Sequence, residues 1–293
     1  METQPYGNSG FEVSVLGLGA GQIGDASIDE AQVSRFLNTT LDLGITLIDT
    51  ARGYGLSEER IGRHLAHRRS EFVLSTKLGY GIPGQTDWTG AAVDAGVDEA
   101  LRRLATDCID IVHLHSCELP TLLSGEVIDA LERARDKGKL RTVAYSGENE
   151  ALAWAIASAR FSGVECSVNM FDQASLDERL PRAARQGIGV IAKRALGNAP
   201  WRFAERPVGD YCEIYWERMQ RLAYDTVGMA WDEFALRFSA WQPTVSCAIA
   251  GTASIEHLRH NVAIVEAGPL AADLVAEVRQ RFQSIGADWR GEI

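Results

Sequence analysis

Four side chains of this sequence belong to types that act together in proton transfer. They are Asp49, Tyr54, Lys77 and His115. A tyrosine can donate a proton to an oxygen, and a neighbouring lysine cation lowers the tyrosine pKa from its usual value of about 10. An aspartate can hold that lysine, and a histidine can orient a substrate oxygen. The four residues are therefore a candidate site for general acid catalysis.

The spacing of these residues places them at the ends of predicted strands. Asp49, Lys77 and His115 each stand at the last position of a short apolar run, as does Ser146. Side chains alternate between the two faces of a strand, so Leu47 and Asp49 point the same way. The charged groups are thus expected to lie above an apolar layer.

Eight apolar runs alternate with amphipathic helical patterns along the chain. The runs cover residues 13–18, 46–49, 72–77, 109–115, 140–146, 164–168, 189–193 and 246–250. Helices are expected near 27–41, 57–67, 89–104, 124–137, 148–160, 177–186 and 254–266. Parallel strands need crossover helices, and eight strand–helix units in roughly 250 residues are typical of a (β/α)8 TIM barrel. Without a Pro/Ser-rich linker, residues 1–293 are predicted to form one barrel domain in the α/β class.

Some segments fall outside the eight units. Asn8–Ser9–Gly10 indicates an N-terminal hairpin turn, residues 194–240 hold a loop and two helical patterns, and residues 271–282 form an extra C-terminal helix. The "SIDE" motif at 27–30 has the form of a capping box, which predicts Ser27 as the N-cap of the first helix. The carboxyl ends of barrel strands surround the active site, so the loop after the seventh strand opens on that face.

Composition argues against several classes of partner. The formal net charge of −11 repels phosphate backbones, and no local basic patch offsets it, so neither a nucleic-acid nor an anionic-membrane partner is expected. No apolar stretch approaches the roughly 18 residues needed to cross a bilayer. Five scattered cysteines without a C-x-x-C pair fit a reducing compartment, which predicts a cytoplasmic protein.

The motifs around the four residues resemble those of the aldo-keto reductase family. "GITLIDTARGYGLSEERIG" is similar to the family signature, "LSTKLG" contains the lysine, "CIDIVHLHS" ends near the histidine, and "IAGTASIEHLRHN" resembles the C-terminal cofactor motif. The resemblance implies that a nicotinamide cofactor supplies hydride to an aldehyde or ketone while Tyr54 protonates the oxygen, or the reverse. It also implies catalytic roles for Asp49, Lys77 and His115. Gly53 and Gly55 are expected to let the backbone turn tightly beside Tyr54.

The same resemblance implies the cofactor contacts. The positions that match are Gly19, Ser146, Glu165, Lys193, Leu196, Gly251, Thr252, Ser254, His257 and Asn261. Gly147 and Glu165 depart from the family pattern, which has amides that grip the nicotinamide carboxamide at both places. An ionised carboxylate accepts hydrogen bonds but cannot donate them.

The C-terminal motif bears on the choice of cofactor. It carries hydroxyls and a helix start but no lysine or arginine at the positions that match the family's 2′-phosphate contacts, so a modest preference for NADPH is expected, with NADH usable. Tyr80, Trp88 and Trp201 lie in loops predicted to form the walls of a pocket for a small carbonyl substrate.

Two other interpretations of the sequence stay open. His113 and His115 form an H-x-H pair at a strand end, which a metal-dependent barrel hydrolase could use. Such a site needs further ligands, but the sixth strand offers no histidine and the eighth ends without an acid, so no metal is expected. Alternatively, the barrel could sense a nucleotide or bind a partner with little turnover.

Overall fold

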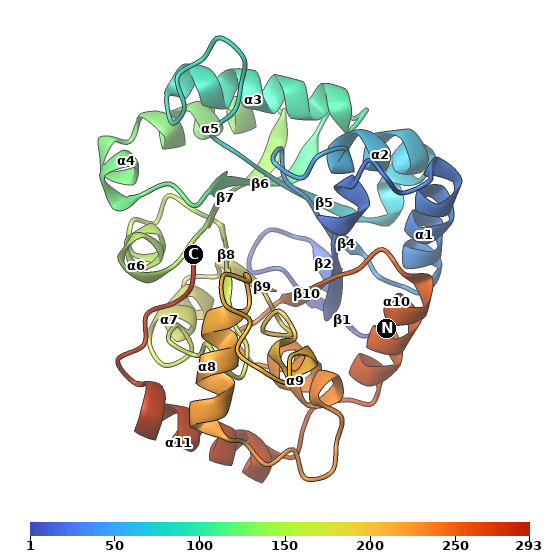
Figure 1. The fold of residues 1–293 in the computed structure, drawn as a ribbon. Helices are drawn as coiled ribbons and strands as arrows, with labels where there is room; N and C mark the ends of the chain where they lie inside the picture. Colours follow the sequence, from blue (N-terminus) through green and yellow to red (C-terminus); the bar gives the residue numbers. More distant parts are fainter.

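Eight parallel strands close into a barrel in the computed structural model, which describes residues 1–293. The strands pair in chain order and the last pairs with the first (Figure 1). They are β3 (Leu16–Gly19), β4 (Leu47–Asp49), β5 (Val73–Leu78), β6 (Ile109–His115), β7 (Leu140–Ser146), β8 (Gly163–Ser167), β9 (Gly189–Lys193) and β10 (Cys247–Gly251). The predicted (β/α)8 barrel is confirmed.

Helices surround the barrel as the crossover connections require. They are α1 (Glu30–Asp42), α2 (Ser57–Leu65), α3 (Gly90–Arg103), α4 (Leu119–Ser124), α5 (Glu126–Asp136), α6 (Asn149–Ala157), α7 (Arg179–Arg185), α8 (Glu213–Leu222), α9 (Trp231–Ala240), α10 (Ile255–Glu266) and α11 (Ala272–Gly286). Short 3-10 helices span Gln22–Gly24, Ala66–Glu71 and Pro200–Arg202. No helix is both long and apolar enough to cross a membrane.

The first helix begins two residues later than the capping box predicts. Asp29, and not Ser27, is the N-cap of α1, because its carboxylate accepts hydrogen bonds from the backbone N–H groups of Ala31 and Gln32. One carboxylate that satisfies two free N–H groups next to the positive end of the helix dipole is a stronger cap than a hydroxyl. Thr89 and Ser254, with which two other predicted helix ranges begin, are the N-caps of α3 and α10 and accept helix N–H groups.

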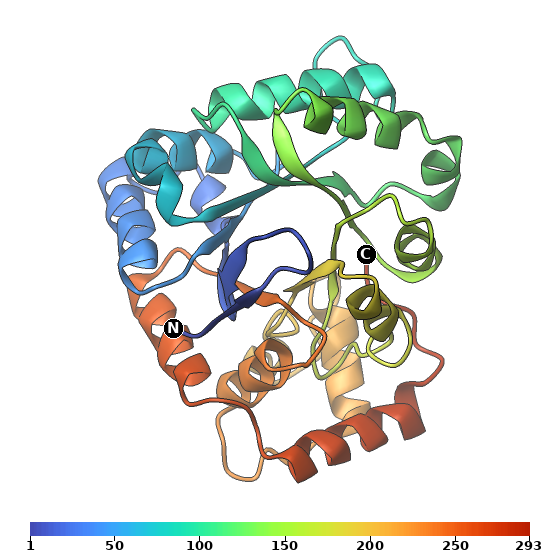
Figure 2. The same ribbon diagram turned by 180° about the vertical axis from the view of Figure 1, so that it is seen from behind.

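An N-terminal hairpin covers the end of the barrel at which the strands begin. Strands β1 (Thr3–Pro5) and β2 (Glu12–Ser14) pair antiparallel, as the Asn8–Gly10 turn predicts. The predicted first strand therefore divides, since residues 12–14 belong to the hairpin and only β3 enters the barrel. Tyr6 fills the interior below Leu47 and Val73 and is fully buried. Figure 2 shows the hairpin lying across this mouth.

The strand register brings the predicted polar residues to the opposite end. Asp49 stands beside Ser75, Lys77 beside His113, His115 beside Ser146, and Ser146 in turn beside Glu165. Residues that are level on neighbouring strands and share the inner face lie side by side. The apolar layer beneath them includes Leu47, Val73, Ile111, Ala144 and Ile191. The expectation of charged groups above an apolar floor is confirmed.

Candidate active site

The ammonium of Lys77 lies at the centre of the polar layer. It contacts Asp49 Oδ2, lies 3.3 Å from Glu165 Oε2, and donates to the carbonyl oxygen of Thr50 at 3.1 Å. All three charged side chains are buried. Burial works to lower the lysine pKa, but the two carboxylates outweigh it and raise the pKa of Lys77, so the side chain stays a cation.

Two carboxylates compete for this one cation. Burial, followed by the charge of Glu165, raises the pKa of Asp49, although Lys77 and the Ser75 hydroxyl, which donates at 2.7 Å, act the other way. Burial also works to raise the pKa of Glu165, but the positive charge of Lys77 lowers it. Glu165 Oε2 is buried and has no hydrogen-bond partner in the protein. It is ion-paired with Lys77 at 3.3 Å but accepts no hydrogen bond, and Glu165 lies at the wall of a cleft.

Tyr54 lies above this cluster and is half-buried. The ammonium of Lys77 is 5.3 Å from the centre of its ring, and the ring packs edge-on against His115 with centroids 6.0 Å apart. Lys77 has the largest single influence on the Tyr54 pKa and lowers it, as expected. Burial and the charges of Asp49 and Glu165 outweigh that influence and raise the pKa of Tyr54 to about 12. The expectation that the Tyr54 pKa is lowered is therefore wrong, because burial and the two buried carboxylates outweigh the effect of Lys77.

The glycines beside Tyr54 have different roles. Gly55 has a φ of +53°, in the left-handed region that favours glycine. Gly53 does not; a Cβ there would lie 2.8 Å from the Tyr80 hydroxyl. Gly53 thus makes room for a neighbouring side chain and does not relieve a strained turn.

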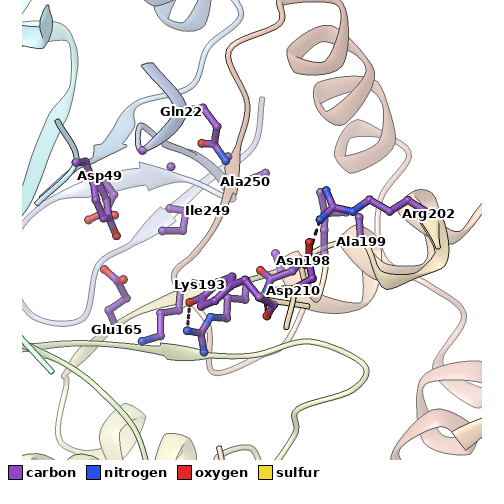
Figure 3. A pocket seen from close by; sticks show the side chains of 18 residues that line it. Gln22, Asp49, Glu165, Lys193, Asn198, Ala199, Arg202, Asp210, Ile249 and Ala250 are labelled. Carbon is purple, nitrogen blue, oxygen red and sulfur yellow. Dashed lines mark hydrogen bonds and ion pairs between the residues drawn. The ribbon is translucent and has the colours of Figure 1, made fainter. Parts of the chain in front are cut away.

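A cleft of about 590 Å³ opens over these residues (Figure 3). Asp49 and Tyr54 line it together with five of the predicted cofactor positions, Gly19, Glu165, Lys193, Leu196 and Gly251. Lys193 is partly neutralised by Glu148, whose Oε1 lies 3.5 Å from its Nζ. Ser146 is buried behind the wall, and its hydroxyl donates to Glu165 Oε1 at 3.4 Å.

A second cavity of about 570 Å³ continues from the first along the start of α10. Gly251, Thr252, Ser254 and His257 line it, as the sequence predicts for a cofactor end. Gln22, Gln32 and Arg35 complete it from the other side. The sequence did not predict these three residues: Gln32 and Arg35 lie on α1, which meets α10 where the barrel closes, and Gln22 lies in the 3-10 helix after β3. Asn261 lies one turn further along α10, is buried, and lines neither cavity.

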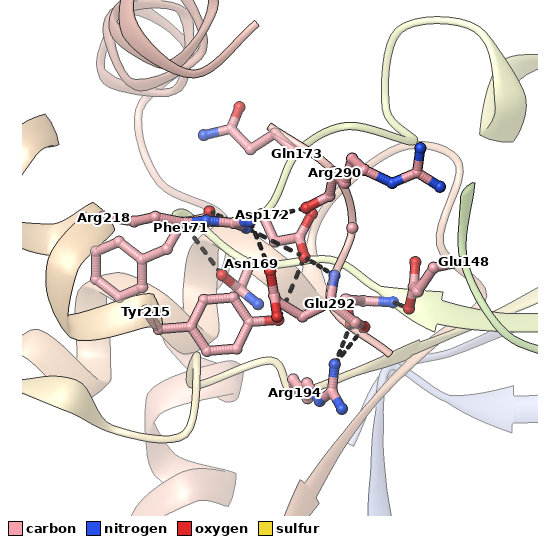
Figure 4. Close-up of polar contacts among 12 residues, drawn as sticks. Glu148, Asn169, Phe171, Asp172, Gln173, Arg194, Tyr215, Arg218, Arg290 and Glu292 are labelled. Carbon is pink, nitrogen blue, oxygen red and sulfur yellow. Dashed lines mark hydrogen bonds and ion pairs between the residues drawn. The ribbon is translucent and has the colours of Figure 1, made fainter. Parts of the chain in front are cut away.

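The loop after β9 is held beside the cleft by the C-terminal segment (Figure 4). The guanidinium of Arg194 donates to the Glu292 carbonyl oxygen, and the Glu292 carboxylate pairs with Arg218 at 2.8 Å. Asp172 accepts from the Glu292 backbone N–H at 3.0 Å. Arg194 and Asn198 line the cleft, so the C-terminal segment supports one of its walls.

The three predicted wall aromatics separate into two groups. Tyr80 and Trp88 pack together, with ring centroids 5.7 Å apart, and Tyr80 contacts His115, but neither lines the cleft. Trp201 stacks on Trp231 at 6.0 Å, packs on the hydrophobic core, and does not line the cleft. Its position is that of a loop anchor.

The H-x-H pair does not converge on one point. His113 is fully buried beside Glu165, with 3.9 Å between His113 Nε2 and Glu165 Oε2, whereas His115 is half-buried and turned towards Tyr80. Asp49, His113 and Glu165 form the one group of three possible metal ligands. The ammonium of Lys77 already lies against both carboxylates, where a metal cation would have to sit.

We predict that Lys77→Met destabilises the protein increasingly as pH rises. Without the Lys77 cation, the pKa values of the Asp49 and Glu165 carboxyls rise in the folded state. The folded state then binds more protons than the unfolded chain. The variant is then stable near pH 4. Its free energy of unfolding falls by about 3–5 kcal/mol as the pH rises through the raised pKa values of the two carboxyls, and the pKa of Asp49 is already about 7 in the wild type. Urea unfolding between pH 5 and 8 measures this. Lys139→Met, which removes a lysine paired with Asp98 at the surface, is the control. A pH dependence equal to that of the wild type would contradict the charge cluster.

Comparisons with known proteins relate the chain to the aldo-keto reductases. A family model described as Aldo/keto reductase family matches residues 15–281. L-galactose dehydrogenase of Arabidopsis thaliana is 26% identical, covering 90% of this chain and 88% of its own length. A protein of the same plant named probable voltage-gated potassium channel subunit beta is 26% identical, with 97% of each chain covered.

The solved structures that resemble this chain also include an aldo-keto reductase. An aldo-keto reductase from Bacillus halodurans, in its holo form, superimposes with a TM-score of 0.82 at 26% identity, covering 98% of this chain and 97% of its own. The family match spans the barrel and both cavities, and the family consists of oxidoreductases that generally use nicotinamide cofactors. The chain therefore belongs to the aldo-keto reductase family.

Proposed function

We propose that the protein interconverts a carbonyl compound and its alcohol, with a nicotinamide cofactor as hydride carrier and Tyr54 as proton donor. The observation that carries the proposal is the meeting of Tyr54, His115 and the Asp49–Lys77 pair at the mouth of the barrel. These residues come from the ends of three strands and the loop after β4, where barrel enzymes hold their catalytic groups.

The residues lining the cleft fit a nicotinamide group. When bound, the cofactor supplies or accepts the hydride. The unpaired Glu165 Oε2 is an acceptor for a carboxamide NH2, and the second cavity offers the N–H groups of a helix start to a phosphate. Together the two cavities give an elongated ligand a continuous path that passes Gln22 and Gly251, which line both.

The charges around Tyr54 favour the protonated phenol. With a pKa of about 12, Tyr54 holds its proton at neutral pH and is ready to donate it to a substrate oxygen. In the oxidative direction the phenolate must accept a proton, and its fraction rises with pH. At neutral pH the protonated Tyr54 therefore favours carbonyl reduction, and the rate of alcohol oxidation is expected to increase as the pH rises.

We expect Tyr54→Phe to lower kcat for aldehyde reduction by roughly 10²- to 10⁴-fold, because the proton donor is lost. Cofactor affinity should change little. Steady-state oxidation of NADPH with a panel of aldehydes measures the loss, and fluorescence titration measures cofactor binding. Tyr6→Phe is the matched control, since its hydroxyl has no hydrogen-bond partner and lies at the far end of the barrel. Turnover retained by Tyr54→Phe would refute the mechanism.

Glu165→Gln should tighten NADPH binding roughly 3- to 10-fold, since an amide adds a donor and removes a buried acid. The gain should be smaller for NADP⁺, because the carboxylate attracts the cationic ring of the oxidised cofactor. Isothermal titration of both forms separates the two effects. Glu58→Gln, which changes another buried acid with an unpaired oxygen, is the control. Unchanged or weaker NADPH binding would show that Glu165 does not face the carboxamide.

The second cavity supports a preference for NADPH over NADH. Arg35 of α1 lines it opposite Ser254 and His257, and supplies the cation that the C-terminal motif lacks. The hydroxyls of Thr252 and Ser254 accept N–H groups in the loop and helix, at 3.0 and 3.4 Å, and keep their own protons for a phosphate. A guanidinium at the edge of an open cavity gives a modest, salt-dependent preference.

The corresponding prediction is that Arg35→Gln weakens NADPH binding by roughly 3- to 10-fold and leaves NADH unaffected. Dissociation constants for both cofactors, measured at low and high salt, test this. Arg259→Gln is the control, because Arg259 is exposed on α10 but does not line the cavity. If Arg259→Gln weakens NADPH binding and Arg35→Gln does not, the phosphate lies elsewhere on α10.

The similarity to a probable potassium channel β subunit supports a second candidate function, which is partner binding with little turnover. That relative matches 97% of this chain, and partner binding with slow turnover is compatible with the same cleft. Binding of NADPH without oxidation by any aldehyde would favour this function.

A further inference from the structure

The only protein hydrogen bond made by the imidazole of His115 is to Tyr80. The phenol oxygen of Tyr80 lies 3.0 Å from His115 Nδ1, and the two rings lie 5.6 Å apart at 34°. The other ring nitrogen, Nε2, has no partner in the protein. The sequence predicts Tyr80 as a pocket wall, yet its hydroxyl is already bound to His115.

The loop after β5 is built to hold Tyr80 in this place. Gly79 has a φ of +131°, and a Cβ there would lie 2.1 Å from the Trp88 ring, so only glycine lets that ring pack close. The Trp88 backbone N–H closes the loop by donating to the Gly79 carbonyl at 2.8 Å. Gly53 leaves the space that the Tyr80 hydroxyl needs. Glycines on two separate loops thus make room for Trp88 and for Tyr80, whose rings pack together.

The protonation of the two partners allows Tyr80 to be the donor of the hydrogen bond. Burial, assisted by Lys77, lowers the pKa of His115 to about 3, so the ring is neutral and carries a single N–H. Burial also raises the pKa of Tyr80, so the phenol keeps its proton. Tyr80 can then donate to Nδ1, which leaves the proton of the ring on Nε2.

The opposite arrangement would fit a carbonyl poorly. If Nδ1 donated to the Tyr80 oxygen, Nε2, on the ring that packs edge-on against Tyr54, would carry a lone pair and no proton. Two acceptors that face one another repel, whereas an N–H group in the same place stabilises an oxygen on which negative charge develops. His113 provides the contrast, because neither of its ring nitrogens has a hydrogen-bond partner that would select a tautomer.

We infer that Tyr80 is a positioning residue that holds His115 in the Nε2–H tautomer, so that His115 donates a hydrogen bond to the oxygen of a carbonyl substrate. The acceptor, and with it the choice between the two tautomers, rests on the proposed function, whereas the Tyr80–His115 hydrogen bond does not. Tyr80 itself does not touch the reacting atoms. Its effect reaches them through the imidazole, as partners behind a functional histidine do elsewhere.

Nitrogen-15 NMR of the protein labelled at its histidine rings tests the tautomer directly. The signals of His115 are assigned from their loss in His115→Gln. In the wild type we expect the proton on Nε2, with Nδ1 as a hydrogen-bonded acceptor. In Tyr80→Phe we expect the Nδ1 signal to lose its hydrogen-bond shift and the ring to populate both tautomers. Tyr145→Phe is the matched control, since its hydroxyl donates to the Cys117 carbonyl at 2.8 Å and does not reach His115.

Kinetics then link the tautomer to the reaction. Tyr80→Phe should lower kcat for aldehyde reduction roughly 10-fold with a smaller change in KM, because the lost donor acts mainly on the transition state. A His115 proton on Nδ1 in the wild type, or His115 signals unchanged in Tyr80→Phe, would overturn the inference. If the NMR result holds and no aldehyde is reduced, the proposed function fails while the assigned tautomer stands.

Discussion

The buried ammonium of Lys77 is the interaction on which the rest of the site depends. It neutralises Asp49 and Glu165, neither of which could stay charged inside the barrel without a cation. One cation and two acids leave an excess of negative charge below Tyr54, which explains why the phenol keeps its proton despite a lysine 5.3 Å from its ring. The position of Lys77 follows from its place at the inner end of β5, level with His113 on β6.

Glu165 is the residue that gives the cluster of Asp49, Lys77 and Glu165 its excess negative charge. An amide in its place would leave the Asp49–Lys77 pair balanced, whereas the carboxylate adds a charge and an unpaired oxygen at the wall of the cleft. A carboxylate here attracts the cationic ring of an oxidised nicotinamide more than the neutral ring of the reduced one. The same residue therefore links cofactor affinity, the Tyr54 pKa and the direction of the reaction.

The parts of the fold and site that follow from local patterns could be predicted from the sequence. Strand ends, inward alternation and barrel closure brought Asp49, Lys77 and His115 together as expected, because a period of two and parallel strands leave little freedom. What depends on contacts between distant segments could not be predicted. Arg35 reaches the second cavity only because α1 lies beside α10, and Tyr80 meets His115 through a loop whose course depends on Gly53 and Trp88. The net effect on the Tyr54 pKa was missed for the same reason, since Glu165 meets Lys77 across the barrel.

The central claim is that the protein transfers hydride from the nicotinamide cofactor to a carbonyl compound. Deuterium transfer tests it most directly, with NADPH labelled at the reactive position of its dihydronicotinamide ring. The wild-type protein is incubated with the labelled cofactor and a panel of aldehydes, and the alcohols are analysed by mass spectrometry and NMR. The account predicts one deuterium on the carbinol carbon of the product, formed in proportion to the NADPH consumed. Tight binding of NADPH with no deuterium in any product would contradict it, and would point to a barrel that binds the cofactor without using it.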